Sequence, residues 1–592
     1  MQSNQTWRSA CLHGSAKVRA AAATALLIAA LPLSAQPFTR TIAAGETVVV
    51  NRSSVFAVPS NESLLIELGG ELQGRGSVIG LGGLVQNNGQ LRAFKGSENS
   101  TAVGVSGQLN NSLTGRIEVT SLWVQAGGAI TSAGGFVVGG FRINPGDPLT
   151  TVCAFDIPCP GTGFEIDAGG VITVASGAPM LNYGNAQISG MLDNRGSFVS
   201  RNSINTSATP PDRPYAQVLT VGKDPDYGVG SGQVLNSGSF ELQRGNTLRN
   251  FSGVFNSGSL LLNGGKLEVL APGRLGNTGD IQVGAGGQLA INGLIVDNLG
   301  NRIPSLLSTG TINVADGELV NRSLIHLVAS GNAPAVLSVG KLGTVSQGDG
   351  YGQLLLQGGE LLVEGKYTGT SVTVDNLGTQ IGAVSIAKDA EMRLDELRQI
   401  NGILKVDGEL WASVRLEGGD LRGTGRINGE VFVRGLGGGP RQEPPNCGNA
   451  FYACFRPGNS PGHMDISGAL TLGANSILEL EIERDANGAL AWDSVFADTM
   501  SFEYGSSIRV LIGAGVPGSA LIDLDLLQCG TLCNWDGAQF EVVGGAGGEF
   551  TLGTNGLHFA LAPVPEPGTW ALWMIGAAAL AGSRWRRRQA RP

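Results

Sequence analysis

A short unit that recurs about every 21 residues most strongly constrains how this chain can fold. Each copy joins an apolar residue, an Asn-x-Gly triplet and a segment that alternates apolar with polar or small residues, as in "VLNSGSFELQ" from residue 234 and "VFNSGSLLLN" from residue 254. The asparagines stand at positions 194, 236, 256, 277 and 298. The gaps between them are 42, 20, 21 and 21 residues, and we interpret the first gap as two periods.

Such a repeat predicts a solenoid. Alternation places every second side chain of a strand on one face, and a unit of about 20 residues can bury that face only against a copy of itself. We therefore predict an all-β chain in which residues 36–434 form a right-handed parallel β-helix. An array of β-sandwiches is the alternative fold, but it needs longer strands and more aromatic residues than the 6% present here.

We expect asparagine and glycine to occupy the corners of the predicted coils. We expect glycine to supply positive φ, asparagine to tolerate it, and stacked asparagines to form a hydrogen-bonded ladder along the rod. The segment "KDAEMRLDELRQI" from residue 388 is the one place in the repeat where a short helix fits the pattern.

Breaks in the repeat divide the chain. We expect loop excursions at 144–163 and 207–230, and a Cys/Pro-rich connector at 435–458 that separates the solenoid from a C-terminal β module at 459–562. The start of that module, "NSPGHMDISGALTL", resembles the module that ends many exported bacterial β-solenoid proteins, including autotransporter passengers. A cap is needed there because the last coil otherwise exposes an open strand edge.

The N-terminus and the cysteines indicate export. Lys17 and Arg19 precede a short apolar run and "LSA", a pattern typical of a signal peptide over residues 1–35. Outside it, the cysteines form three pairs that are close in sequence: Cys153 and Cys159, Cys447 and Cys454, Cys529 and Cys533. Three local disulfides are the simplest interpretation for an exported chain, although six cysteines can also pair in other ways.

The composition argues against several classes of function. A net charge of −9 disfavours nucleic acid as a partner, and four scattered histidines provide no zinc ligands or general base. We therefore predict no metal site, no cofactor and no catalytic residue. The alternative is a polysaccharide lyase or hydrolase, in which Glu165 and Asp167, two residues apart and on the same side of a strand, act on a sugar.

The end of the chain, residues 563–592, has three parts. Pro565, Glu566 and Pro567 are followed by an uncharged apolar run at 570–582 and then by a cluster of arginines, namely Arg584, Arg586, Arg587, Arg588 and Arg591. We predict a single transmembrane helix whose Arg-rich end stays in the cytoplasm. The run is short for a hydrocarbon core of about 30 Å, so spanning requires snorkelling arginines and local thinning.

In its order and spacing this tail resembles the PEP-CTERM protein-sorting signal. The resemblance implies processing by the membrane enzyme exosortase, transient anchoring through the helix, and release to the cell surface or extracellular matrix together with exopolysaccharide. We therefore predict an exported, non-enzymatic structural protein of the surface or biofilm matrix, or an adhesin. An ordinary C-terminal membrane anchor is the alternative interpretation of the tail.

Overall fold

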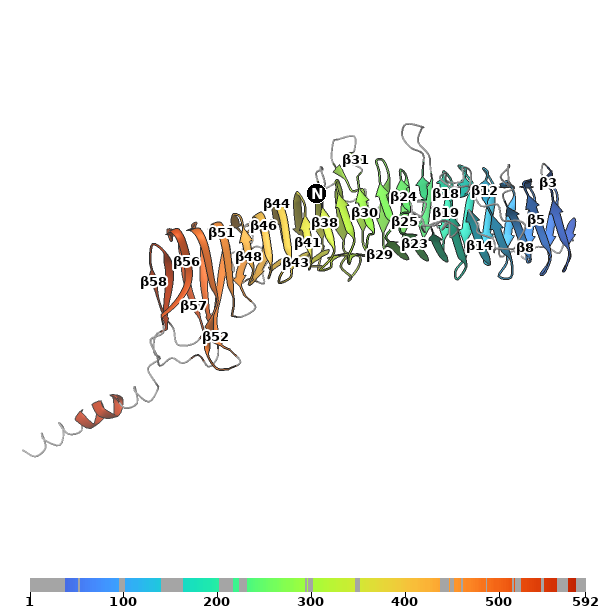
Figure 1. Ribbon diagram of the computed structural model, residues 1–592. Helices are drawn as coiled ribbons and strands as arrows, with labels where there is room; N and C mark the ends of the chain where they lie inside the picture. Colours follow the sequence, from blue (N-terminus) through green and yellow to red (C-terminus); the bar gives the residue numbers. More distant parts are fainter. Residues whose placement is uncertain are drawn as a thin grey trace, which may run out of the picture.

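The computed structural model shows a long rod of stacked β-coils that runs from the first strands to the C-terminal cap (Figure 1). The structure describes residues 38–51, 54–94, 102–139, 163–201, 217–222, 232–292, 295–296, 302–346, 352–436, 447, 452–458, 461–485, 487–513, 516, 523–544, 548–561 and 573–581. The predicted signal peptide, 1–35, lies outside these residues. The all-β, parallel solenoid architecture is confirmed.

Three strands make one coil, and each strand pairs in parallel with its counterpart in the next coil, so the rod has three faces. Face 1 contains β1 (Arg40–Ile42), β4 (Ser63–Ile66), β7 (Leu84–Asn87), β10 (Gln108–Asn111), β13 (Ala129–Ser132), β16 (Val171–Val174), β19 (Met191–Asn194), β22 (Gln233–Asn236), β25 (Gly253–Asn256), β28 (Arg274–Asn277), β33 (Leu306–Ser308), β36 (Leu324–Val328), β39 (Gln353–Gln357), β42 (Ser371–Asp375) and β49 (Val431–Val433).

Face 2 follows face 1 along the chain and continues without interruption to the cap. It contains β2 (Thr47–Val50), β5 (Glu71–Arg75), β8 (Gln90–Phe94), β11 (Arg116–Val119), β14 (Gly135–Gly139), β17 (Pro179–Tyr183), β20 (Ser197–Ser200), β23 (Ser239–Gln243), β26 (Ser259–Asn263), β29 (Asp280–Val283), β34 (Thr311–Val314), β37 (Val336–Val339), β40 (Glu360–Val363), β43 (Ala383–Ile386), β45 (Ile403–Val406), β47 (Gly419–Gly423), β50 (Ala453–Pro457), β52 (Ser476–Arg484), β55 (Ser506–Ile512) and β57 (Ala538–Val543).

Face 3 completes each coil. It contains β3 (Val55–Val58), β6 (Val78–Leu81), β9 (Ala102–Val105), β12 (Ser121–Val124), β15 (Gly163–Ile166), β18 (Asn185–Ile188), β21 (Val218–Val221), β24 (Thr247–Asn250), β27 (Lys266–Val269), β30 (Gln288–Ile291), β35 (Glu318–Asn321), β38 (Thr344–Ser346), β41 (Lys366–Thr368) and β48 (Arg426–Asn428).

Five long strands run through faces 1 and 3 together in the C-terminal part of the rod: β44 (Glu391–Gln399), β46 (Glu409–Leu416), β51 (His463–Leu472), β54 (Ser494–Phe502) and β56 (Asp523–Asn534). The first of them pairs with β41 of face 3 through its beginning and with β42 of face 1 through its end. A register shift between Arg393 and Glu396 replaces the turn that separates faces 3 and 1 in the earlier coils. The prediction of a short helix at residues 388–400 is therefore wrong, because Glu391–Gln399 is a strand whose apolar residues point into the core on both sides of the bulge.

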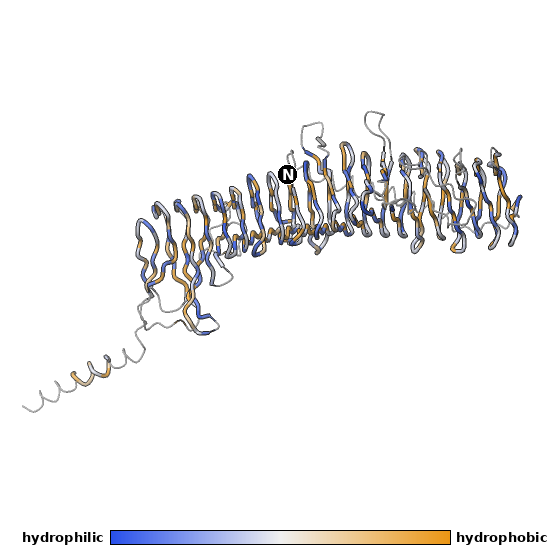
Figure 2. Tube along the Cα trace, in the orientation of Figure 1, coloured by the Kyte–Doolittle hydropathy of each residue, from blue (hydrophilic) through white to orange (hydrophobic). Residues whose placement is uncertain are grey.

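The core is a continuous column of side chains from the three faces. Apolar and polar residues alternate along each coil (Figure 2), and the buried positions carry mostly Leu, Ile, Val and Phe. The same inward position in successive coils places Phe198 directly against Phe240, with ring centroids 4.4 Å apart. Because each buried aliphatic side chain contributes about 1.5–3 kcal/mol, the stack is held mainly by apolar burial that no single coil achieves.

The predicted asparagine ladder is confirmed. At the corner between faces 1 and 2, the buried Asn194 side chain donates to Asn236 Oδ1 at 2.7 Å, Asn236 donates to Asn256 at 2.6 Å, and Asn256 donates to Asn277 at 2.8 Å. Each of these Nδ2 groups also donates to a backbone carbonyl oxygen in the next coil, such as that of Asp280 for Asn256. The ladder therefore pairs polar groups that burial would otherwise leave unsatisfied.

The glycines of the Asn-x-Gly triplets have a different role from the one expected. None of Gly196, Gly238, Gly258 and Gly279 has positive φ, and the ladder asparagines have none either. A Cβ at Gly238 would instead lie 2.0 Å from the carbonyl oxygen of Gly196, and one at Gly258 would lie 2.1 Å from that of Gly238. Glycine is required here because successive backbones approach too closely for any side chain.

Two details of the predicted register are wrong. The strand of Asn194 pairs directly with the strand of Asn236, so the 42-residue gap is one long coil and not two periods. The ladder also passes from Asn277 to Ser308 and bypasses Asn298, which lies outside the described residues. Around it, β31 (Ile295–Val296) and β32 (Arg302–Ile303) form an antiparallel hairpin instead of a coil.

The expected excursions coincide with gaps between strands of consecutive faces. Nearly all of 144–163 lies outside the described residues, between β14 and β15. The expected excursion at 207–230 is divided in two, because Val218–Val221 inside it forms β21, a regular strand of face 3. Pattern breaks alone did not reveal this strand because the sequence on either side of it departs from the repeat.

Stacking continues through the expected connector. Ala453–Pro457, which falls within 435–458, is strand β50 and pairs in parallel with β47 before it and β52 after it. A ladder of charges crosses the same region, in which Arg456 contacts Asp420 at 3.4 Å and Glu479 at 3.3 Å, and Arg509 contacts Glu479 at 3.6 Å. The described part of 459–562 therefore extends the same solenoid with longer strands, so the connector does not separate them.

Antiparallel strands close the end of the rod. The hairpin of β58 (Gly548–Leu552) and β59 (Gly556–Leu561) adds to the last long strand, β56, while the short strand β53 (Leu490–Trp492) folds back on β52. Phe550 packs between Phe540 and Phe559, with ring centroids 5.0 Å apart on each side. This hairpin provides the edge protection that a terminal coil needs.

The structure describes a helix at residues 573–581, within the predicted membrane-spanning run. Its side chains are exposed, including Trp573, Met574, Ile575 and Leu580. Over the described residues, no helix has the length and apolar character needed to cross a membrane, so the predicted transmembrane helix is not supported.

The ladder yields a test of what holds the coils in register. Replacing Asn256 by Ala removes the Oδ1 that accepts from Asn236 and the Nδ2 that donates to Asn277 Oδ1, which we expect to destabilise the adjacent coils by about 1–3 kcal/mol. Hydrogen–deuterium exchange over residues 232–292 measures this loss. Asn263→Ala, at an exposed strand end of face 2, is the matched control. Equal exchange in both variants contradicts a stabilising ladder.

Candidate functional site

The outward side chains of face 3 form a second kind of ladder, exposed to solvent. Strand pairing aligns Trp123 with Glu165 of the next coil and, farther along the rod, aligns Thr368, Arg393, Trp411 and Asn428. Each coil therefore presents one outward residue at the same height on this face. Two exposed tryptophans, Trp123 at 44% and Trp411 at 39%, stand in these aligned rows.

The sequence-predicted carboxylates lie beside the first of these tryptophans. Glu165 is exposed on β15, and Asp167 follows the strand and accepts a hydrogen bond from Trp123 Nε1 at 2.9 Å. The structure thus brings both carboxylates to one side, as expected from their spacing. The hydrogen bond gives Asp167 a structural partner in the preceding coil, and neither carboxylate lines either of the two grooves described below.

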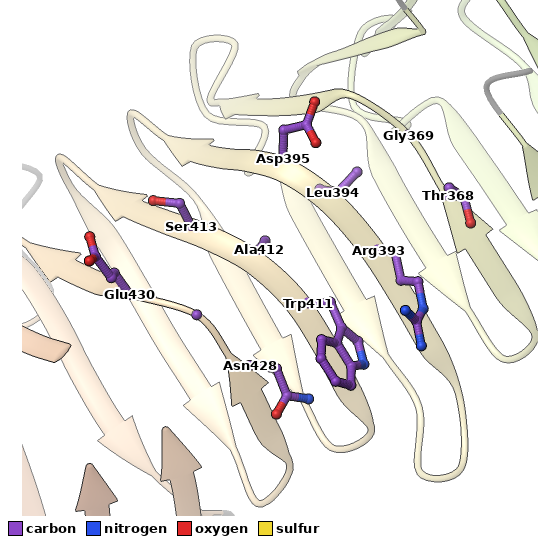
Figure 3. Close-up of a pocket in the computed structure, with 11 residues that line it drawn as sticks. Thr368, Gly369, Arg393, Leu394, Asp395, Trp411, Ala412, Ser413, Asn428 and Glu430 are labelled. Atoms are coloured by element: carbon purple, nitrogen blue, oxygen red, sulfur yellow. The ribbon is translucent and has the colours of Figure 1, made fainter. Parts of the chain in front are cut away.

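The groove around the second tryptophan has a volume of about 440 Å³ and lies where faces 1 and 3 have fused (Figure 3). One wall carries Arg393, Trp411 and Asn428, and the other carries Asp395, Ser413 and Glu430. Each wall has one residue from each of three successive coils. The groove therefore runs along the rod axis, across the strands.

The depth of this groove comes from its floor. The residues between the two walls are Leu394, Ala412 and Gly429, whose side chains become smaller from coil to coil. A Cβ at Gly429 would lie 2.1 Å from the carbonyl oxygen of Ala412, so the third coil cannot fill the hollow with a side chain. The bulge that fuses the faces and the shrinking floor together leave the strands concave here.

Charges within the groove are unevenly distributed. The guanidinium of Arg393 lies 4.7 Å from the ring centroid of Trp411 and is paired with Glu391. The indole N–H of Trp411 donates to Glu409 Oε2 at 3.3 Å. With Asp395 and Glu430 on the opposite wall, the groove holds more carboxylate than cationic charge, and it combines an aromatic surface with hydroxyl and amide groups.

A second groove, of about 560 Å³, follows the corner between faces 2 and 3. Its lining is rich in glycine, including Gly264 and Gly286, which have positive φ and make the turn. Within its lining, Gln288 donates to Glu318 at 2.6 Å, and Ser346, outside the lining, donates to the same carboxylate at 3.1 Å. It offers no exposed aromatic group among its lining residues.

Two of the three expected disulfides are present. Cys447 bonds Cys454 and Cys529 bonds Cys533, with Cα–Cα distances of 5.6 and 5.7 Å. Cys153 and Cys159 lie outside the described residues. Within the described ranges no cluster of three or more His, Cys, Asp or Glu side chains could hold a metal ion.

Two buried titratable groups lie away from the grooves. Asp493 accepts hydrogen bonds from the backbone N–H groups of Gly462 at 2.7 Å and Glu481 at 2.9 Å, and burial raises its pKa to about 7. Burial lowers the pKa of His326, whose ring Nε2 lies 2.9 Å from Gln357 Oε1. Both groups connect neighbouring strands, which is a structural role.

Comparison with known proteins identifies the end of the chain. Residues 563–588 match the family model described as the PEP-CTERM protein-sorting motif. The chain carries a PEP-CTERM sorting motif. The match includes Pro565, Glu566 and Pro567 and the first four of the five expected arginines, all of which lie outside the described residues. The motif implies an exported protein that exosortase sorts.

The other comparisons add little. A crystal structure of a TibC-catalysed, hyper-glycosylated TibA55-350 fragment is similar at 15% identity and covers 62% of this chain and 94% of that one. Its TM-score is 0.18, too low to support a structural or functional inference. No curated protein matches the sequence.

Sequence reasoning did not find the groove around Trp411. The available signal was one tryptophan at an outward position of an alternating strand, "ELWASVRL", in a chain with few aromatic residues. The walls could not be identified in the same way, because Arg393 and Asn428 become neighbours of Trp411 only through the register of three coils.

The raised pKa of Asp493 predicts a pH dependence of stability. The folded pKa of about 7 exceeds the ordinary value of 3.8, so folding favours the protonated form. The stabilisation is fully present below about pH 3.8 and is lost as the pH rises through about 7. We expect the thermal midpoint of the wild type to fall between pH 5 and pH 8 by more than that of Asp493→Asn. Asp498→Asn, an exposed carboxylate on β54, is the control and should resemble the wild type. An identical pH dependence in Asp493→Asn contradicts this assignment.

Proposed function

We propose that this protein is a structural rod of the cell surface or extracellular matrix, sorted by exosortase, that associates with exopolysaccharide and acts as a scaffold or adhesin. The observation that carries the proposal is the combination of a continuous parallel solenoid with a C-terminal sorting motif. A solenoid of this kind is stiff and extended, because each coil is bonded to both neighbours along its full length. The sorting motif supplies a route to the outside of the cell.

Transient membrane attachment belongs to the same proposal. In this scheme the tail holds the exported chain at the membrane, with the arginines on the cytoplasmic side, until exosortase removes it.

A non-enzymatic role is part of the proposal. Its support is the environment of the two candidate carboxylates, since Asp167 is hydrogen-bonded to Trp123 and Glu165 stands on an exposed strand face outside both grooves described above. Acid–base catalysis on a sugar requires two carboxyl groups that flank the scissile bond within a binding cleft.

Processing of the tail can be tested by intact mass. We expect the mature protein from an exosortase-containing host to lack the Arg-rich end, because the motif directs its removal. A variant with Ala at Pro565, Glu566 and Pro567 should keep the full tail and remain in the membrane fraction. Glu549→Ala, on the exposed surface of the cap, should be processed normally. A wild-type mature protein that retains the tail contradicts sorting by exosortase and favours an ordinary anchor.

The non-enzymatic role has its own test. We expect no change in chain length when the mature protein is incubated with the exopolysaccharide of its host, as measured by size-exclusion chromatography. Chain shortening that disappears in Glu165→Gln or Asp167→Asn would establish the lyase or hydrolase alternative. Chain shortening that survives both substitutions would also contradict a purely structural role and would place the chemistry elsewhere.

A further inference from the structure

We propose that the groove formed by β41, β44, β46 and β48 binds a neutral, unbranched polysaccharide segment that packs against Trp411 and runs along the rod axis. The inference rests on the proposed function in that it names where and how the rod holds exopolysaccharide. It depends on the geometry of one groove, described above (Figure 3).

The chemistry of the lining matches a sugar ring. A pyranose has apolar C–H faces and a rim of hydroxyl groups, so it needs an aromatic surface beside donors and acceptors of hydrogen bonds. Trp411 keeps 39% of its surface exposed although Arg393 packs on its ring, so aromatic carbon remains open to the groove. Asn428 and Ser413 provide donors and acceptors, and Glu430 accepts.

The spacing of the lining matches a linear polymer. Parallel strands lie about 4.8 Å apart, which is close to the length of one sugar unit in an extended 1,4-linked chain. Thr368, Arg393, Trp411 and Asn428 occupy one register position in four successive coils, so the wall extends over roughly 15 Å. A segment of about four sugar units can therefore lie along it with one unit beside each coil.

The charged residues of the groove favour a neutral polymer over an anionic one. Asp395 and Glu430 line one wall, while the positive charge of Arg393 on the other wall is compensated by Glu391. An anionic polysaccharide or a nucleic acid would meet net negative charge in the groove, whereas a neutral chain would not.

An extended peptide is disfavoured by the backbone. The strands that form the groove are paired on both sides by neighbouring coils, so they present no free edge for strand addition. A peptide would lie across the strands without main-chain hydrogen bonds. Recognition through side chains alone, at intervals of one coil, suits a polymer whose own groups repeat at that interval.

The experiment uses the exported full-length chain and three neutral probes: cellohexaose, xylohexaose and mannohexaose. Isothermal titration calorimetry should detect binding of at least one of them, and Trp411→Ala should weaken that binding about tenfold or more. Trp411→Phe, which keeps an aromatic surface, should retain most of the affinity. Trp123→Ala is the matched control, because this tryptophan has the same outward orientation on face 3 but lies outside the groove.

The binding measurements distinguish results that support the proposed site from results that overturn it. Loss of binding in Trp411→Ala with retention in Trp123→Ala supports the proposal, and unchanged circular dichroism shows that the variant has folded. The proposal is overturned if none of the three neutral probes binds, or if Trp411→Ala binds as tightly as the wild type. It is also overturned if the anionic probe hexagalacturonate, titrated in the same way, binds more tightly than the neutral probes. None of these outcomes affects processing of the tail, which intact mass measures, so the failure of this site is distinguishable from a failure of exosortase sorting.

Discussion

Parallel hydrogen bonding between successive coils is the interaction on which the rest of this structure depends. It fixes the separation of neighbouring backbones, and every other requirement of the rod follows from that distance. At the corner between faces 1 and 2 the backbones approach so closely that a Cβ at Gly258 would overlap a carbonyl oxygen. The preceding Asn256 turns inward, where the Asn277 side chain and the Asp280 carbonyl oxygen of the next coil accept hydrogen bonds from its amide. The Asn-x-Gly triplet is therefore required by the close approach of backbones in successive coils, which are distant in the sequence.

The same stacking arranges the outer surface. Because strand pairing repeats one register from coil to coil, outward residues that are far apart in sequence form rows along the rod. Arg393, Trp411 and Asn428 stand in one such row although 17 or 18 residues separate each from the next. A groove appears where this regularity is interrupted, at the bulge that fuses two faces and above the shrinking side chains of Leu394 and Ala412.

Predictions that depended on residues close together in the sequence held, and predictions that depended on pairing between coils did not. Alternation and the asparagine ladder are encoded within each unit, and both are confirmed, whereas the predicted period fails at the 42-residue gap and after Asn277. The sequence could not show that the 42-residue gap is a single coil. A strand such as Val218–Val221 is defined by its partners in the neighbouring coils and not by its own residues. Continuity through Ala453–Pro457 was missed for the same reason, since a Pro- and Cys-rich stretch resembles a linker until its pairing with β47 is known.

What the sequence alone determined is therefore local and repetitive. It predicted the solenoid, three close cysteine pairs, of which the two in the described residues are bonded, and the sorting motif, each encoded by residues within a short span. Only the tertiary structure decided where coils begin and end, why the triplet glycines are required, and which side chains surround Trp411. These properties depend on the register between coils, and that register is set by packing and backbone pairing across tens of residues.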